Sequence, residues 1–174
     1  MNSSPTNKTQ QTEYFMREAL KQADMALRKN EVPVGAVITF ENKIIAKAFN
    51  QVESLNDPTA HAEMIAITQA TNTIGHKWLN EAQMYVTLEP CCMCAGALVL
   101  ARVKNIYIGT MDPKAGACGS VVNIIHHAKL NHRVAIHQGL LADECALMLS
   151  NFFKKKRQAQ KDNSEYKDFL INPN

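Results

Sequence analysis

The sequence has no long apolar run, no paired set of cysteines and no strong excess of charge of either sign. Its longest apolar stretch, from Cys91 to Ala101, is far shorter than the ~18 residues that a membrane-spanning helix needs. The opening residues, MNSSPTNKTQQTE, contain no apolar core of the kind found in secretion signals. These absences argue against a membrane or exported protein and predict a cytoplasmic chain.

The small net charge limits how the chain can bind nucleic acid. The 19 basic and 16 acidic residues leave a formal charge of +3. Any contact with nucleic acid must therefore depend on basic residues clustered in one place, because the overall charge is too weak to provide it.

The five cysteines do not suit a disulfide framework, since their number is odd and Cys91, Cys92 and Cys94 lie almost side by side. In a cytosolic chain, such a cluster is more typical of a metal site. Cys92 and Cys145 are predicted to be small buried side chains without a chemical role.

The chain contains neither an internal repeat nor a linker between two domains. Its 174 residues are enough for one domain with a core of its own. We expect a disordered polar lead-in over residues 1–11, a single domain over residues 12–161 and a C-terminal tail over residues 162–174.

Hydrophobic periodicity predicts an alternation of helices and strands in the second half of the chain, which requires crossovers and some parallel pairing. Residues 41–42 are expected to join two strands as an antiparallel hairpin, and residues 51–58 to form a loop. The second helix is expected to have Asp57 or Thr59 as its N-cap. Helices are predicted over residues 12–29, 59–73, 91–101 and 142–159, and strands over residues 34–40, 43–49, 84–88, 105–109 and 133–137.

One set of residues carries a definite chemistry. His61, Cys91 and Cys94 offer the nitrogen and sulfur ligands that zinc favours. A structural zinc site needs four protein ligands, and the sequence offers neither a second C-x-x-C nor an H-x-x-x-H pair. Three protein ligands leave room for a water, whose pKa zinc lowers toward ~7 to give a hydroxide nucleophile.

Glu63 is the candidate proton carrier beside this metal. Replacing a ring amino group with oxygen requires a proton to move from the water to the ring and another to reach the departing ammonia. Because positions 61 and 63 would point to opposite sides of a helix, we expect His61 at or just before the first turn. Taken singly, His61 would be a surface histidine and Glu63 an acid favoured at a helix start. Together with the cysteines they match the known H-x-E…P-C-x-x-C signature of zinc deaminases.

Longer strings around these residues extend the match to most of the chain, from about residue 12 to residue 156. The sequence thereby resembles the bacterial tRNA-specific adenosine deaminases of the cytidine deaminase-like superfamily. The matching strings are EVPVGAV at 31–37, DPTAHAE at 57–63, YVTLEPC at 85–91, MCAGA at 93–97, NHR at 131–133 and ADEC at 142–145. Cys92 and Cys118 depart from the family pattern, but neither change removes a ligand.

The resemblance implies an α/β fold, a three-layer α/β/α sandwich with a central five-stranded mixed sheet. It also implies a homodimer, one zinc ion per chain and conversion of adenosine to inosine at the first (wobble) anticodon position of tRNA. His61, Cys91 and Cys94 match the family's zinc ligands, and Glu63 matches its proton shuttle.

The resemblance also places substrate-binding residues. Asn50 matches a residue that hydrogen-bonds the flipped purine, Val34 an apolar wall beneath it, and the backbone N–H of Ala62 would hold the purine edge. Asn50 at a strand end would otherwise be explained by turn chemistry. The family match also makes Asn131, His132 and Arg133 candidates for contact with tRNA.

A basic cluster, KKKR at positions 154–157, ends the predicted last helix. A run of charges is usually a solvated helix face. Here Phe152 and Phe153 should dock the helix on the body and so direct the charges, which makes contact with tRNA phosphates the competing interpretation. The predicted tRNA contacts are Lys154, Lys155, Lys156 and Arg157.

Two other functions remain open at this point. A deaminase of free guanine or of deoxycytidylate would use the same His61, Glu63, Cys91 and Cys94, although the basic cluster and the longer strings argue against it. A non-catalytic zinc-stabilised RNA-binding subunit would not need Glu63.

Overall fold

The computed structural model describes the backbone of residues 5–171 and the side chains of residues 8–162. Within this part, a mixed five-stranded sheet has the strand order β2-β1-β3-β4-β5. β1 pairs antiparallel with both β2 and β3, whereas β3, β4 and β5 run parallel. The strands are β1 (Gly35–Phe40), β2 (Lys43–Phe49), β3 (Gln83–Leu88), β4 (Asn105–Thr110) and β5 (Ala135–Gln138).

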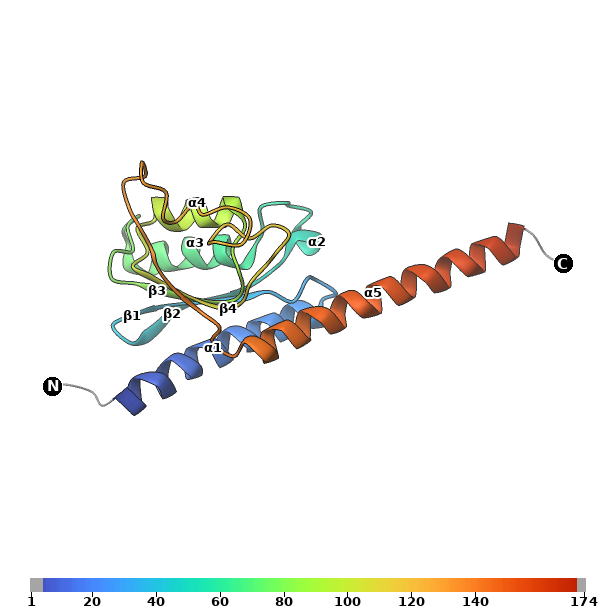
Figure 1. Ribbon diagram of the computed structural model, residues 1–174, viewed down its shortest axis with the longest axis horizontal. Helices are drawn as coiled ribbons and strands as arrows, with labels where there is room; N and C mark the ends of the chain where they lie inside the picture. The colour runs from blue at the N-terminus through green and yellow to red at the C-terminus, as the bar shows by residue number, and fades with distance from the viewer. Residues whose placement is uncertain (1–4, 172–174) are drawn as a thin grey trace.

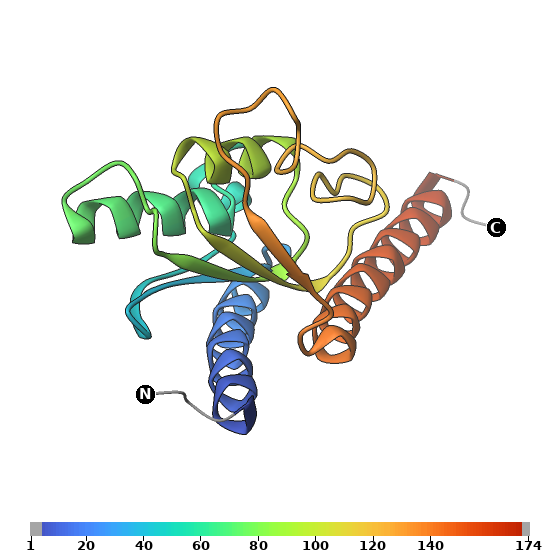
Figure 2. The same ribbon diagram turned by 60° about the vertical axis from the view of Figure 1, so that its left-hand side comes forward.

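Helices cover both faces of this sheet (Figures 1 and 2). α3 and α4 lie on one face, while α1 and α5 lie on the other and α5 runs on beyond the body. The predicted three-layer α/β/α sandwich is therefore confirmed. The helices are α1 (Pro5–Arg28), α2 (Val52–Leu55), α3 (Ala62–Ile74), α4 (Cys92–Leu100) and α5 (Ala142–Ile171).

Local sequence explains the tightest features of this fold. Glu41 and Asn42 both have positive φ, 49° and 60°, as a two-residue hairpin turn requires, and the predicted hairpin is confirmed. Gly35 lies where α1 crosses β1, and a Cβ there would overlap the backbone of Ala19 and Ala23. The absence of a side chain thus lets the helix approach the sheet closely.

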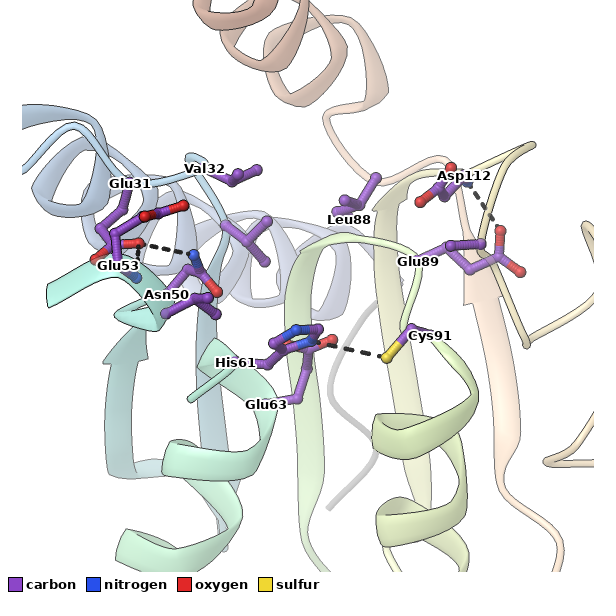
Figure 3. A pocket seen from close by; sticks show the side chains of 13 residues that line it. Glu31, Val32, Asn50, Glu53, His61, Glu63, Leu88, Glu89, Cys91 and Asp112 are labelled. Carbon is purple, nitrogen blue, oxygen red and sulfur yellow. Dashed lines mark hydrogen bonds between the residues drawn. The ribbon is translucent and has the colours of Figure 1, made fainter. Parts of the chain in front are cut away.

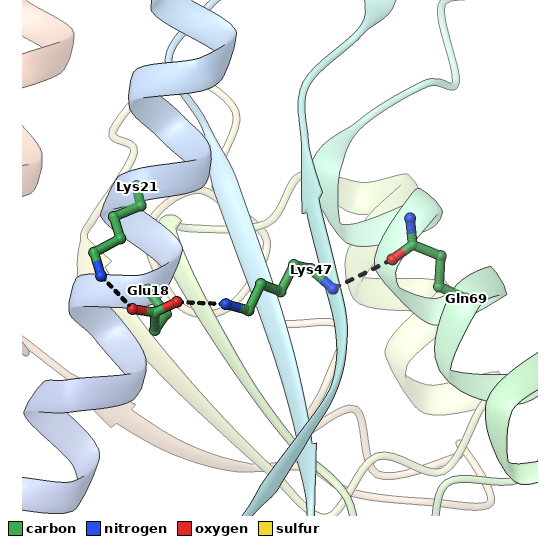
Figure 4. Close-up of polar contacts among 4 residues, drawn as sticks. All are labelled: Glu18, Lys21, Lys47 and Gln69. Carbon is green, nitrogen blue, oxygen red and sulfur yellow. Dashed lines mark hydrogen bonds and ion pairs between the residues drawn. The ribbon is translucent and has the colours of Figure 1, made fainter.

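A buried carboxylate joins α1 to the edge strand β2. Glu18 accepts hydrogen bonds from Lys21 and from Lys47 of β2, with N···O distances of 2.5 Å each (Figure 4). The backbone N–H of Lys47 donates to Oε1 of Gln69 on α3 at 3.2 Å. Hydrogen bonds from Lys21 and Lys47 outweigh burial and hold the pKa of Glu18 below its ordinary value. β2 is thereby attached to helices on both faces of the sheet.

Several predicted boundaries are wrong. The first helix begins at Pro5, so residues 5–11 of the expected disordered lead-in are helical, and residues 1–4 lie outside the described part. The last helix continues to Ile171 and takes in most of the expected tail. The expected loop over residues 51–58 contains the short helix α2. These helices extend through polar sequence, where hydrophobic periodicity gives no signal.

Two side-chain predictions also fail. Phe152 is buried and anchors α5, but Phe153 is 41% exposed, because the next position on a helix points about 100° away. Cys145 is buried as expected, whereas Cys92 is exposed on α4. Among the described residues, no helix combines the length and apolarity needed to cross a membrane.

Candidate metal centre and substrate pocket

Two helices begin at the same place in the molecule. His61 is the N-cap residue of α3 and Cys91 that of α4, both with extended backbone, φ −71° in each case. The expected position of His61 just before the first turn is therefore confirmed, while the expected caps Asp57 and Thr59 are wrong. Instead, Oδ1 of Asp57 accepts hydrogen bonds from the N–H and hydroxyl of Thr59 at 2.8 and 2.7 Å.

The three predicted ligand atoms meet there. Nδ1 of His61 lies 3.7 Å from Sγ of Cys91 and 3.6 Å from Sγ of Cys94, and all three atoms lie within 4.8 Å of one another. Zinc–sulfur and zinc–nitrogen bonds of ordinary length at tetrahedral angles place such atoms about 3.6 Å apart. The donor set therefore fits zinc, and no fourth protein ligand joins it among the described residues.

The electrostatics of His61, Cys91 and Cys94 favour a bound cation. Hydrogen bonds with Cys94 and then His61 lower the pKa of Cys91 to about 3, and the bond to Cys91 raises the pKa of His61. The Cys94 thiol has a raised pKa because Cys91 lies beside it and because it is buried. Cys91 is thus readily deprotonated, whereas Cys94 would lose its proton only beside a positive ion.

Glu63 lies immediately behind the ligand cluster in the first turn of α3 (Figure 3). Its side chain is buried, and burial raises its pKa although His61 acts in the opposite direction. A carboxyl group of raised pKa next to a metal centre is suited to accept and return a proton.

A pocket of about 280 Å³ opens in front of these groups. Asn50 and Val34, which the resemblance names as substrate-binding residues, lie in its wall together with Glu63. Nδ2 of Asn50 donates to Oε2 of Glu31 at 3.2 Å. The lining residues are Glu31, Val32, Val34, Asn50, Val52, Glu53, His61, Glu63, Leu88, Glu89, Cys91, Asp112 and Ala115. Ala62 is not among them, since its side chain is buried in the core and only its backbone N–H, unpaired within the helix at position N1, remains to act.

A second hollow, of about 510 Å³, shares Val32, Leu88 and Asp112 with the first pocket and continues it toward α5. Arg157 and Lys114 line this second hollow, as does Phe153. The exposed ring of Phe153 therefore faces a space beside the substrate pocket.

The four residues of the basic cluster point to different sides of α5, because successive positions on a helix point about 100° apart. Arg157 lies in the second hollow. Burial raises the pKa of Glu31, but hydrogen bonds from Ser54 and Glu53, with a smaller contribution from the charge of Lys156, hold that pKa below its ordinary value. Lys155 lies in another groove, between α1 and α5, and Lys154 is exposed and lines none of these hollows. The four residues thus do not form one patch.

Asn131, His132 and Arg133 lie away from both hollows. His132 has a structural contact, because its Nε2 donates to the carbonyl oxygen of Val103 at 2.7 Å. Asn131 and Arg133 are exposed on the segment before β5. Contact of these residues with the substrate would require a part of it that lies outside the pocket.

Sequence reasoning missed four acidic residues of the pocket, namely Glu31, Glu53, Glu89 and Asp112. Glu31 is 0% exposed and Glu89 is 3% exposed. Both stand directly beside apolar or proline residues in the sequence, and a charged residue in such a setting is a signal for a buried, hydrogen-bonded carboxylate.

Comparison with known proteins agrees with this geometry. The family described as the cytidine and deoxycytidylate deaminase zinc-binding region matches residues 9–110. The chain is 45% identical to the tRNA-specific adenosine deaminase of Bacillus subtilis, over 89% of this chain and 99% of that protein. It is 50% identical to the enzyme of the same name from Aquifex aeolicus, over 83% and 95%. A solved structure from a study of A-to-I editing by tRNA:A34 deaminases at the wobble position superposes with a TM-score of 0.76, at 41% identity, over 78% of this chain and 99% of that chain.

Proposed function

Since the chain belongs to the zinc-binding cytidine and deoxycytidylate deaminase family, and within it to the tRNA-specific adenosine deaminases, we propose that it converts adenosine to inosine at the first anticodon position of tRNA. One observation carries this proposal. The ligand atoms of His61, Cys91 and Cys94 converge beside a pocket of about 280 Å³, which His61, Cys91 and Glu63 line.

The chain's own residues account for the chemistry. Nδ1 of His61 and the sulfurs of Cys91 and Cys94 would hold one zinc ion per chain. When bound, zinc lowers the pKa of a water in the open position. Glu63 would take one proton from the attacking water and deliver it to the ring nitrogen. It would then take the second proton from the new hydroxyl group on the ring carbon and deliver it to the departing ammonia, so that the carboxylate ends unprotonated, as it began.

The pocket wall selects the base. Asn50 offers hydrogen bonds to the purine edge, the backbone N–H of Ala62 holds a further acceptor, and Val34 packs against the ring face. Once a bound base displaces water from the pocket, these contacts are stronger than the same contacts would be in solution.

The distribution of charge keeps the phosphates outside this pocket. Glu53 and Asp112, the less buried acidic residues of its lining, repel an anion, whereas Arg157 and Lys114 line the adjoining hollow. A flipped nucleotide thus places its neutral base inside and its flanking phosphates beside the basic residues. Further contacts of the tRNA with Lys154, Lys155, Lys156 and the segment Asn131–Arg133 belong to the same proposal.

The remaining features are proposed on the resemblance and on composition. The catalytic domain extends over residues 12–161, with α1 and α5 continuing beyond it at its two ends. The active form is a homodimer, and the enzyme works in the cytoplasm.

Single-turnover inosine formation on an anticodon stem-loop, compared with ammonia release from free adenosine, guanine and deoxycytidylate, tests this function. We expect the stem-loop to react much faster, because binding energy from its flanking nucleotides holds the target base in place. Faster reaction of guanine or deoxycytidylate would assign the site to a free base or nucleotide. Inertness toward every substrate, with zinc bound, would favour a binding subunit.

A further inference from the structure

Glu89 is a buried carboxylate that neither the metal centre nor the proton transfer uses. It follows β3, precedes Cys91 by two residues and is 3% exposed. A carboxylate in such a place is unfavourable unless hydrogen-bond donors surround it. Its donors all come from one segment, residues 112–120, which we call the pocket loop because Asp112 and Ala115 line the substrate pocket.

The carboxylate holds both ends of the pocket loop. Oε2 of Glu89 accepts a hydrogen bond from the N–H of Asp112 at 2.9 Å, and also one from the hydroxyl of Ser120 (Figure 3 shows the first). Oε1 accepts from the N–H groups of Cys118 and Ser120 at 2.9 and 3.1 Å. Four donors thus converge on two oxygen atoms, which a charged carboxylate accommodates and a neutral amide does not.

The pocket loop is folded closely around this side chain. A Cβ added to Gly116 would overlap the Glu89 carboxylate. The N–H of Ala117 donates to the carbonyl oxygen of Pro90 at 2.8 Å, and the N–H of Glu89 donates to that of Thr110 at 2.9 Å. The loop is therefore joined to the turn that carries the metal ligand Cys91.

We propose that Glu89 is a positioning residue, which fixes the pocket loop against the metal-ligand turn and thereby keeps Asp112 and Ala115 in the substrate pocket wall. Glu89 acts through the loop: its side chain lines the pocket, but both of its carboxylate oxygens are taken up by donors of the pocket loop. The identity of that substrate rests on the proposed function, but the contact between Glu89 and the loop does not.

The test uses Glu89→Gln in the zinc-loaded full chain, with three measurements. Backbone amide exchange at Asp112, Cys118 and Ser120 should accelerate by about tenfold or more, because the variant no longer offers them a charged acceptor. Zinc content should stay that of the wild type. With the anticodon stem-loop, KM should rise at least about fivefold while kcat falls less than about threefold, because the pocket wall is loosened and the metal centre is not.

Glu81→Gln is the matched control, since Glu81 is an exposed carboxylate paired with Lys104 and absent from the pocket. It should leave all three measurements unchanged. Ser120→Ala removes one donor at an exposed position and should move exchange and KM in the same direction by a smaller amount, even if Glu89→Gln fails to fold.

Unchanged exchange in the pocket loop of both variants would overturn the proposal. Faster exchange with an unchanged KM would also overturn it, because the contact would then be structural only. A wild-type enzyme inactive on the stem-loop would contradict the proposed function instead, while amide exchange would still decide whether Glu89 holds the loop.

Discussion

Nδ2 of Asn50 donates a hydrogen bond to Oε2 of Glu31 at 3.2 Å, and Glu31 is completely buried. The same carboxylate accepts the N–H groups of Glu53 and Ser54, at 3.2 and 2.6 Å, from the first turn of α2. The orientation of the Asn50 carboxamide is therefore set before a substrate arrives. Preorganisation of this kind lowers the cost of binding.

Glu31→Gln should disturb this arrangement without touching the metal centre. Glutamine would replace one acceptor oxygen of Glu31 with an NH₂ group, which cannot accept the hydrogen bonds that this oxygen now accepts. Leaving buried polar groups unsatisfied costs roughly 1–3 kcal/mol of stability. We expect a higher KM for the stem-loop, a lower melting temperature and unchanged zinc. Glu81→Gln, at an exposed carboxylate that pairs with Lys104 outside the pocket, is the control. Equal KM values for the two variants would contradict a role for Glu31 in orienting Asn50.

Glu63→Gln should preserve the fold and one zinc per chain, because Glu63 is not a ligand and glutamine has nearly its shape. The rate of the chemical step should fall by ~10²–10⁴-fold, the usual effect of removing a general acid–base group. Single-turnover kinetics with zinc-replete protein would measure it. A variant of near-normal rate would assign the proton transfer to another group.

Serine substitution should separate the metal ligands from their neighbour. Cys91→Ser and Cys94→Ser should lose zinc and unfold at lower temperature, because metal binding is coupled to folding. Cys92→Ser is the control, since Cys92 is exposed on α4 and outside the ligand cluster. Elemental analysis and thermal unfolding would provide both readouts. Loss of zinc from Cys92→Ser would show that the ligand set is wrong.

The divided basic cluster predicts unequal effects on tRNA binding. Arg157→Gln should weaken binding and reduce the magnitude of the salt slope by ~0.7–0.9 for each phosphate that the variant no longer neutralises. Lys155→Gln, a similar change on the side of α5 that faces α1, should have a smaller effect. Binding titrations across a range of salt concentrations would compare them. Equal salt slopes for the two variants would indicate that tRNA binding depends on the total charge of the basic cluster and not on the position of each residue.

Glu18 should contribute to the acid sensitivity of the fold. Its pKa is lowered in the folded state, chiefly by hydrogen bonds from Lys21 and Lys47, so its stabilisation is complete above the unfolded-state pKa of about 4.5. The stabilisation is lost as the pH falls through the lower folded-state pKa. Glu18→Gln should therefore lower the free energy of unfolding at neutral pH, by an amount that shrinks below about pH 4.5. Denaturant unfolding at a series of pH values would measure this. Glu41→Gln, in the exposed hairpin turn, should show no such pH-dependent difference.

The sequence alone was sufficient for the elements that local rules govern. Short β-rich runs and turn residues such as Glu41-Asn42 mark the strands, so the bounds of all five could be predicted to within two residues. The ends of α1 and α5 could not, because polar helices that extend beyond the core have no apolar face to mark them. His61, Cys91 and Cys94 were predicted because only a few residue types bind zinc and their spacing places them at helix starts.

Other parts of the site were decided by tertiary structure. Glu31 and Glu89 acquire their roles from donors that lie 19–31 residues away in the chain, and no local pattern records such contacts. The division between Lys155 and Arg157 depends on the rotation of α5 about its axis, which the packing of Leu149 and Phe152 determines. Ligand identity is thus a property of the residues themselves, whereas their orientation and support depend on packing between elements distant in sequence.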